Sequence, residues 1–290
     1  MTRIGIIGGT GLYELPGLSR IREIKVDTPF GEPSDSLVTG ELSGAELVFV
    51  PRHGRGHRLL PNEVPYRANI YALKSLGVEW VLSVSAVGSL REEIHPGELV
   101  IPAQYVDQTR RRVGTFFGNG LVAHVSLAVP VCPVLSEHLA AVVAKAAGRV
   151  HREVTYVCIE GPAFSTRAES ELFRAAKMDV IGMTAMPEVR LAREAELHYA
   201  TLGLVTDYDC WHESEAAVSA DAVVEILKKG TEVIRSIIVT ALPGLVSLTR
   251  DRKRSCACDR ALATALLTQP ADAPAKVREA LLPIIGKYVK

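Results

Sequence analysis

Short apolar runs alternate with helical patterns along most of this 290-residue chain, and this alternation constrains its fold most strongly. Residues 3–7, 80–85 and 198–206 are typical of strands. The near-continuous apolar run at 80–85 is typical of a strand buried within a parallel sheet. Apolar side chains recur at helical spacing over 65–76 and in a long segment that begins near Ser219. The pattern predicts an α/β fold with helices flanking a mixed, distorted central β-sheet.

The other expected elements continue this alternation. They are strands at 36–40, 46–50, 99–101, 154–159 and 180–182, and helices at 135–147, 166–176, 187–196, 262–267 and 277–282. Pro243 and Gly244 should end the long helix. We therefore expect one α/β domain over residues 1–245. A helical C-terminal extension, residues 246–290, should pack on that same domain.

The overall charge excludes one class of function. Lys plus Arg and Asp plus Glu number 33 each, so the formal net charge is zero, which argues against a nucleic-acid partner bound through a basic surface. The uncharged stretches 118–136 and 236–249 are broken by proline or too short to span a bilayer. The start, MTRIGIIGGTG, lacks the apolar core of a signal peptide. We expect a soluble, cytoplasmic protein with no membrane partner.

The five cysteines are too few and too scattered for a secreted disulfide framework. Cys256 and Cys258 form a Cys-x-Cys pair. A zinc site would need a second pair of ligands, and none lies nearby, so no metal is expected. A strained local disulfide and two ordinary thiols both remain open for this pair.

Two glycine-containing loops follow predicted strands. Gly8-Gly9-Thr10-Gly11 lets backbone N–H groups approach an anion, and Thr10 adds a hydroxyl donor. The loop is neither a P-loop nor a dinucleotide fingerprint, because the third glycine of the latter is replaced by Glu14. The second loop, residues 51–57, holds Arg52 and His53 among four cationic or protonatable side chains, which suit a dianion such as phosphate.

Small polar residues end three more predicted strands. Residues 83–90 close the most hydrophobic strand, and Thr184 follows the strand at 180–182. Ligands of open α/β sheets bind at such carboxyl ends, where hydroxyl groups supply donors. In the segment 160–170, Phe164 could stack on an aromatic ring, while Thr166 and Glu169 have the spacing of a helix capping box.

Asp207 and Asp209 lie two residues apart where the strand 198–206 ends. A carboxyl group that stays protonated could donate to a heteroaromatic nitrogen. The other carboxylate could accept from an exocyclic amine. The alternative is a polar turn capped by aspartates.

Taken together and in order, these motifs resemble the S-methyl-5′-thioadenosine phosphorylases of the trimeric purine nucleoside phosphorylase family over residues 3–245. The motifs are Gly-Gly-Thr-Gly-Leu, Pro-Arg-His-Gly-Arg-Gly-His, Tyr-Arg-Ala-Asn, Ser-Ala-Val-Gly-Ser-Leu-Arg-Glu-Glu-Ile, Glu-Gly-Pro-x-Phe-Ser-x-Arg-Ala-Glu-Ser, Gly-Met-Thr-x-x-Pro-Glu and Thr-Asp-Tyr-Asp-Cys-Trp.

The resemblance implies phosphorolysis of methylthioadenosine to adenine and 5-methylthioribose 1-phosphate, a step of purine and methionine salvage. It implies the nucleoside phosphorylase fold, a homotrimer or a dimer of trimers, and no cofactor, because inorganic phosphate is a co-substrate. The implied phosphate-binding residues are Thr10, Arg52, His53, Ser85, Ala86 and Thr184. The implied catalytic residues are Asp207 and Ser165, and the substrate-binding residues are Phe164, Met183, Asp207, Asp209, His124, Val223 and Val224. His124 would reach the site of a neighbouring subunit.

Three departures from the family pattern are Ala163 in place of a frequent Arg, Ser85 in place of a commoner Thr, and Ala220, which shortens a pocket-lining side chain. The Cys-x-Cys pair resembles that of archaeal thermophilic members, which implies a disulfide between Cys256 and Cys258. The alternatives are a broader purine nucleoside phosphorylase acting also on adenosine, inosine or methylthioinosine, a hydrolase that uses water, and a nucleotide-binding module without catalysis.

Overall fold

The computed structural model describes residues 1–212, 220–251 and 255–289; the side chains of Thr10, of residues 220–223 and of Lys229 also lie outside this description. In the described part, nine strands form one sheet in the order β2-β3-β4-β1-β5-β8-β7-β6-β9. The strands are β1 (Thr2–Gly8), β2 (Ser19–Ile24), β3 (Leu37–Leu42), β4 (Ala45–Pro51), β5 (Trp80–Ser89), β6 (Leu99–Gln108), β7 (His151–Ile159), β8 (Val180–Gly182) and β9 (His198–Asp207).

The sheet is mixed, and part of it closes on itself. Strand β1 runs parallel to β4 and β5, whereas β3 is antiparallel to both of its neighbours. Strand β5 pairs with both β8 and β9, and β6 also pairs with β9, so β5, β8, β7, β6 and β9 form a closed ring of strands. The predicted α/β fold with a mixed, distorted central sheet is confirmed.

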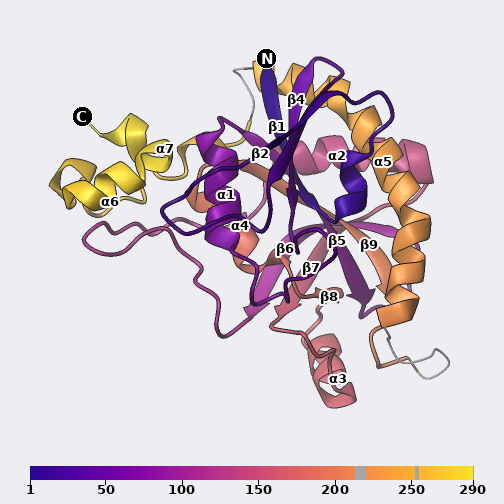
Figure 1. Cartoon of the computed structure of the whole chain (residues 1–290). Helices are drawn as coiled ribbons and strands as arrows, with labels where there is room; N and C mark the ends of the chain where they lie inside the picture. The colour runs from indigo at the N-terminus through magenta and orange to yellow at the C-terminus, as the bar shows by residue number, and fades with distance from the viewer. Residues whose placement is uncertain (213–219, 252–254, 290) are drawn as a thin grey trace.

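Helices cover both sides of the sheet (Figure 1). Helices α2 and α5 pack on each other and on β9, and α1 and α4 pack together on the other side. The longer helices are α1 (Tyr66–Ser75), α2 (Pro133–Ala147), α3 (Arg167–Ala175), α4 (Ala185–Glu194) and α5 (Ala220–Arg250). The shorter ones are η1 (Thr10–Tyr13), η2 (Cys258–Arg260), η3 (Pro270–Asp272), α6 (Ala275–Ala280), α7 (Leu282–Ile285) and η4 (Gly286–Tyr288).

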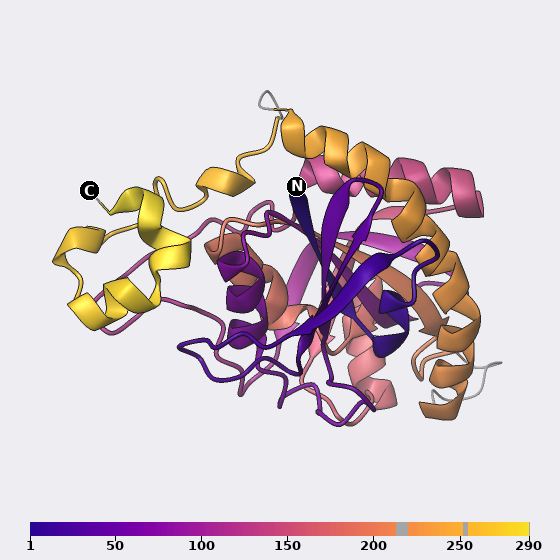
Figure 2. The same ribbon diagram turned by 45° about the horizontal axis from the view of Figure 1, so that its top comes forward.

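The core forms two main layers because side chains alternate across each strand. Along β5, Trp80 and Leu82 face the layer beneath α2 and α5, whereas Val81 faces the layer beneath α1 and α4. The C-terminal α7 packs against α1, and its Ile284 belongs to the α1 layer. Figure 2 shows the C-terminal helices, in yellow, beside α1.

The prediction that Pro243 and Gly244 end the long helix is wrong. Helix α5 continues to Arg250, so the expected domain boundary after residue 245 falls inside it. Pro243 has no backbone N–H to donate within the helix. Because Pro243 is exposed, this hydrogen bond is missing on the side of the helix that faces water. Gly244 provides room instead, because a Cβ there would lie 2.2 Å from Cε1 of His138 on α2.

Helix α5 is long and apolar enough over Val224–Arg250 to cross a membrane by length and composition. Its buried side chains, including Ile234, Ile237 and Leu242, pack against the sheet and α2. The same composition is found in core helices of globular proteins. The expectation of no membrane partner stays a prediction.

Other differences concern short or irregular segments. The helix expected at 262–267 is wrong: these residues form turns, and Leu266 makes an isolated bridge with Ala123. The strand expected at 99–101 extends to Gln108 as β6. Strand β2 has no apolar alternation in its exposed sequence SRIREI, and it was not predicted.

Candidate active site

A cavity of about 500 Å³ lies where the carboxyl ends of β1, β4, β5 and β9 meet the side of α5. This is the position at which open α/β sheets bind ligands. Its lining includes the predicted Arg52, His53, Ser85, Ala86, Phe164, Met183, Thr184, Asp207, Asp209 and Val224. The predicted residues among them lie up to 172 positions apart along the sequence, from Arg52 to Val224, and still meet in a single cavity.

Arg52 lies at one end of the cavity and is held by a buried ion pair. Its Nε and Nη2 donate to the two carboxylate oxygens of Glu188, at 2.8 and 3.0 Å. Nη2 also donates to Ser83 Oγ at 2.6 Å, and Nη1 donates to the Val84 carbonyl at 2.8 Å. These contacts use four of the five guanidinium N–H groups, which leaves one Nη1–H for a ligand.

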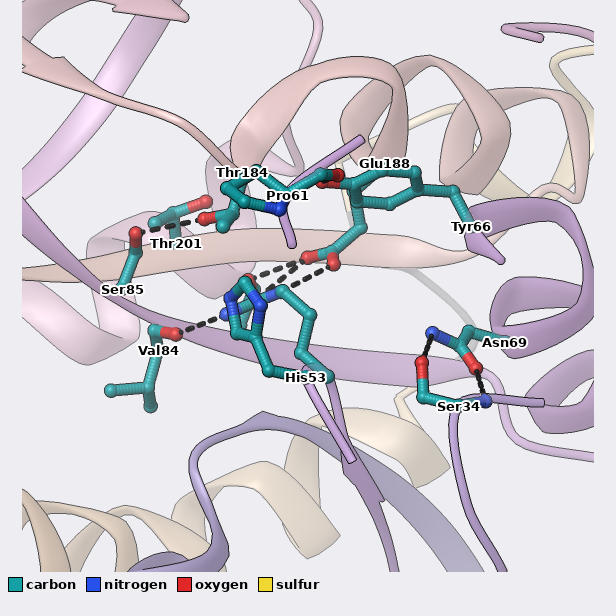
Figure 3. Close-up of polar contacts among 12 residues, drawn as sticks. Ser34, His53, Pro61, Tyr66, Asn69, Val84, Ser85, Thr184, Glu188 and Thr201 are labelled. Carbon is teal, nitrogen blue, oxygen red and sulfur yellow. Dashed lines mark hydrogen bonds and ion pairs between the residues drawn. The ribbon is translucent and has the colours of Figure 1, made fainter. Parts of the chain in front are cut away.

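Several groups also stabilise Glu188, whose carboxylate contacts are marked by dashed lines in Figure 3. Ser83 and Tyr199 each donate a hydroxyl hydrogen bond to Oε1, at 2.7 Å. Burial opposes the charge of Arg52, but the negative charge of Glu188 outweighs it and raises the pKa of Arg52 above its ordinary value. The guanidinium is therefore a fixed positive charge beside the cavity.

His53 lies next to Arg52 and is neutral near pH 7. Burial and the charge of Arg52 lower its pKa to about 4. Its Nδ1 lies 2.9 Å from the carbonyl of Leu59, which can only accept, so the proton is assigned to Nδ1. Nε2 is then a hydrogen-bond acceptor, suited to the P–OH of a hydrogen phosphate dianion.

Ser85 and Thr184 add two hydroxyl groups to the same end. Their oxygens lie 3.0 Å apart (Figure 3). Ser85 also donates to the Ala86 carbonyl at 3.0 Å. Ser85 comes from β5 and Thr184 follows β8, so the antiparallel pairing of these strands brings the hydroxyls together. The combination of hydroxyls with a fixed cation suits an oxyanion.

Asp207 and Asp209 occupy another part of the cavity wall. Asp207 accepts from the Thr206 hydroxyl at 2.7 Å and from the backbone N–H of Asp209 at 2.8 Å. Burial raises the pKa of both carboxyl groups. Gly88 allows the close approach of Asp207, because a Cβ at Gly88 would lie 2.7 Å from Asp207 Oδ1.

Comparison with known proteins identifies the family. A model of the phosphorylase superfamily matches residues 3–243. The S-methyl-5′-thioadenosine phosphorylase of Geobacter sulfurreducens is 56% identical over 287 residues, covering 99% of each chain. The enzyme of that name from Hyperthermus butylicus is 51% identical, over 91% of this chain and 95% of its own.

Solved structures agree with these sequence relatives. A methylthioadenosine phosphorylase from an Antarctic soil metagenomic library has a TM-score of 0.92 and 49% identity, over 98% of both chains. A Schistosoma mansoni adenosine/methylthioadenosine phosphorylase variant, solved with methylthioadenosine, has a TM-score of 0.80 and 36% identity, over 92% of this chain and 99% of its own.

The chain belongs to the S-methyl-5′-thioadenosine phosphorylase family. Within this phosphorylase, Ser165 does not line the cavity, although Phe164 and Met183 do. The buried Ser165 Oγ makes no hydrogen bond in the described residues. It lies near Asp209, where it partly counters the rise in the pKa of Asp209 that burial causes. The Ser165 carbonyl accepts from Cys210 Sγ at 3.3 Å.

Three other predicted site residues are not among the described side chains that line the cavity. His124 is exposed, and its backbone N–H donates to the carbonyl of Ala265, away from the cavity of its own chain. The side chains of Thr10 and Val223 lie outside the described residues, whereas Val224 lines the cavity. The roles given to these residues stay predictions.

Sequence reasoning missed several groups that build the phosphorylase cavity. Glu188 was noted only as part of a motif, although a buried arginine such as Arg52 requires a carboxylate partner. Lys228 and Thr231 line the cavity from α5 and carry no motif that could have revealed them. Asn69, also within a motif, is structural: its amide holds the backbone N–H and hydroxyl of Ser34.

The expectation of no metal rests on the lack of a second ligand pair near Cys256 and Cys258 in the sequence. That reasoning is wrong, because the fold brings two more ligand side chains beside them. Cys132 and His198, distant in sequence, lie beside them in the core of the phosphorylase. All five cysteines are unbonded thiols, so the disulfide implied by resemblance to thermophilic members does not occur in this structure.

Proposed function

We propose that this chain transfers 5-methylthioribose from adenine to inorganic phosphate. The observation that carries the proposal is the arrangement of the cavity, with an anion-binding end at Arg52 and buried carboxyl groups at Asp207 and Asp209. Its volume of about 500 Å³ suits a nucleoside with phosphate beneath it. The enzyme is thus a pentosyltransferase.

In the proposed reaction, a phosphate oxygen forms a bond to the anomeric carbon as the bond from that carbon to the purine nitrogen breaks. The electron pair of the breaking bond stays on the purine. Positive charge develops on the sugar ring, where the phosphate dianion stabilises it. Protonated Asp207 transfers its proton to N7 and neutralises the leaving purine.

Burial makes this proton donor available. An ordinary aspartate is ionised near pH 7, but the raised pKa of Asp207 increases its protonated fraction at any given pH. A bound purine removes further water and strengthens the effect. Asp209 accepts from the 6-amino group, so the pair favours adenine over a 6-oxopurine.

The test is phosphate-dependent release of adenine from methylthioadenosine, with inosine as the matched substrate. We expect turnover that saturates with phosphate and is much slower on inosine. Adenine release that is independent of phosphate would instead indicate the hydrolase. Inosine cleaved as fast as methylthioadenosine would favour the broader phosphorylase.

The assembly and setting are part of the same proposal. We propose a homotrimer or a dimer of trimers, in which the exposed His124 reaches a neighbouring subunit's cavity. Phosphate acts as a co-substrate, and the reaction needs no cofactor. A cytoplasmic location, where thiols stay reduced, belongs to the same proposal.

A further inference from the structure

Four metal-ligating side chains converge in the core, far from the cavity. Cys132, His198, Cys256 and Cys258 are all buried, and their ligand atoms all lie within 4.8 Å of one another. Cys132 precedes α2, His198 begins β9, and the two other cysteines follow α5. No role in the reaction uses these side chains.

The separations between the ligand atoms match a tetrahedral site. Cys132 Sγ lies 3.8 Å from Cys256 Sγ, and each of these sulfurs lies 3.4 Å from His198 Nδ1. With Zn–S near 2.3 Å and Zn–N near 2.0 Å, ideal tetrahedral edges are about 3.8 Å for two sulfurs and about 3.5 Å for sulfur and nitrogen. The three separations among Cys132, Cys256 and His198 thus match the edges of a zinc coordination sphere, and Cys258 Sγ lies within 4.8 Å of all three ligand atoms.

One of the four ligands lies at a helix N-terminus. Cys132 caps the N-terminus of α2, where its sulfur accepts from the backbone N–H of Leu135 at 3.4 Å. Helix N-termini stabilise thiolates. Buried thiolates without a cation would be strongly destabilising.

The backbone also holds these ligands in place. The N–H of Cys132 donates to the Tyr199 carbonyl, and the N–H of His198 donates to the Glu79 carbonyl, both at 2.8 Å. The His198 ring stacks on Trp80, with centroids 4.1 Å apart. The sheet therefore holds the backbone of Cys132 and His198 in place. The C-terminal segment contributes the other two ligands.

We propose that Cys132, His198, Cys256 and Cys258 bind a structural Zn²⁺ ion. Three cysteines and a histidine are a donor set of structural zinc sites, and four protein ligands leave no position for substrate. The site lies at the start of β9 and Asp207 lies at its end, so about 30 Å of strand separates them. The ion fastens the segment after α5 to the sheet.

The test uses the full-length protein, produced in zinc-supplemented cells and purified without chelators. We expect stoichiometric zinc by mass spectrometry. Replacement by Co²⁺ should give the intense visible absorption and the thiolate charge-transfer bands of tetrahedral cobalt. Cys258→Ser should lower the zinc content roughly tenfold or more. Cys158→Ser, which alters a buried thiol outside the cluster, should keep it.

The wild-type measurements decide the question even if Cys258→Ser does not fold. Purified protein without stoichiometric zinc would overturn the proposal. So would stoichiometric iron, or a disulfide among Cys132, Cys256 and Cys258 in non-reducing peptide mapping. Zinc retained by folded Cys258→Ser would also contradict the proposal. A cobalt spectrum without thiolate bands would contradict it as well.

Discussion

At the scale of single residues, Asp207 carries the proposed proton transfer. We expect Asp207→Asn to lower kcat/KM for methylthioadenosine by about 10²–10⁴-fold, which is the usual contribution of a general acid. The variant should also gain measurable activity on inosine, because an amide can pair with a 6-oxo group. Steady-state kinetics on both substrates test this, and unchanged adenine release would exclude the proton-donor role.

The same substitution should stabilise the folded protein near neutral pH. The folded-state pKa of Asp207 is raised, so its contribution to stability is fully present below the unfolded value near 3.8 and is lost as the pH rises through the folded pKa. Asn carries no charge to bury. We expect Asp207→Asn to raise Tm at pH 7 and to change it little at pH 3, as measured by thermal unfolding.

Glu188 should stabilise the folded protein because it balances the buried charge of Arg52. Glu188→Gln leaves a buried guanidinium without its counter-ion, which costs about 3–5 kcal/mol. Denaturant unfolding measures the loss. Glu194→Gln is the matched control, because Glu194 is also buried but accepts from Thr115 and Phe116 and forms no arginine ion pair within the described part of the chain. Equal losses in both variants would show that the ion pair has no special weight.

At the scale of elements, the contact between α2 and α5 allows a paired prediction. Gly244→Ala places a methyl group against the ring of His138, and such overpacking costs about 1–3 kcal/mol. Pro243→Ala, on the exposed side of the same helix, should instead stabilise by up to about 3 kcal/mol. Opposite shifts in Tm are expected, and a gain from Gly244→Ala would contradict the close packing.

The elements were predictable where one local pattern decides the structure. The run at 80–85 indicated β5, and the Thr166–Glu169 spacing indicated the capping box that begins α3. Pro243 predicts the end of a helix because local propensity disfavours proline inside one. The packing of α5 on the sheet and on α2 overrides that preference. The exposed β2 forms through its pairing with β3, which local patterns do not reveal.

At the scale of the whole molecule, the site was predictable where it lies at strand ends. Asp207, Asp209 and Ser85 follow apolar runs, and the ends of such strands meet in a common place. Arg52 and Glu188 are 136 residues apart, and Cys132 and Cys256 are 124 apart, so only the completed topology brings each pair together. The resemblance indicated ten of the residues that line the cavity, but not Lys228, Thr231 or the buried partner Glu188.

The proposed assembly can be tested on the intact protein. We expect sedimentation equilibrium to give three or six times the chain mass of 31.3 kDa. His124→Ala should raise KM for methylthioadenosine while leaving the KM for phosphate unchanged, because it would contact only the far end of a neighbour's substrate. A fully active monomer would contradict the assembly and the role of His124.

The ring formed by β5, β8, β7, β6 and β9 limits how subunits can join. In the described chain it leaves β2 as the outer edge of the sheet, and that edge presents the exposed Arg20, Arg22 and Glu23. Charged edge strands resist backbone pairing with another chain. In the proposed assembly, we therefore expect subunits to meet through loops and helix surfaces rather than by extending the sheet. A charged edge of this kind also disfavours fibrous aggregation.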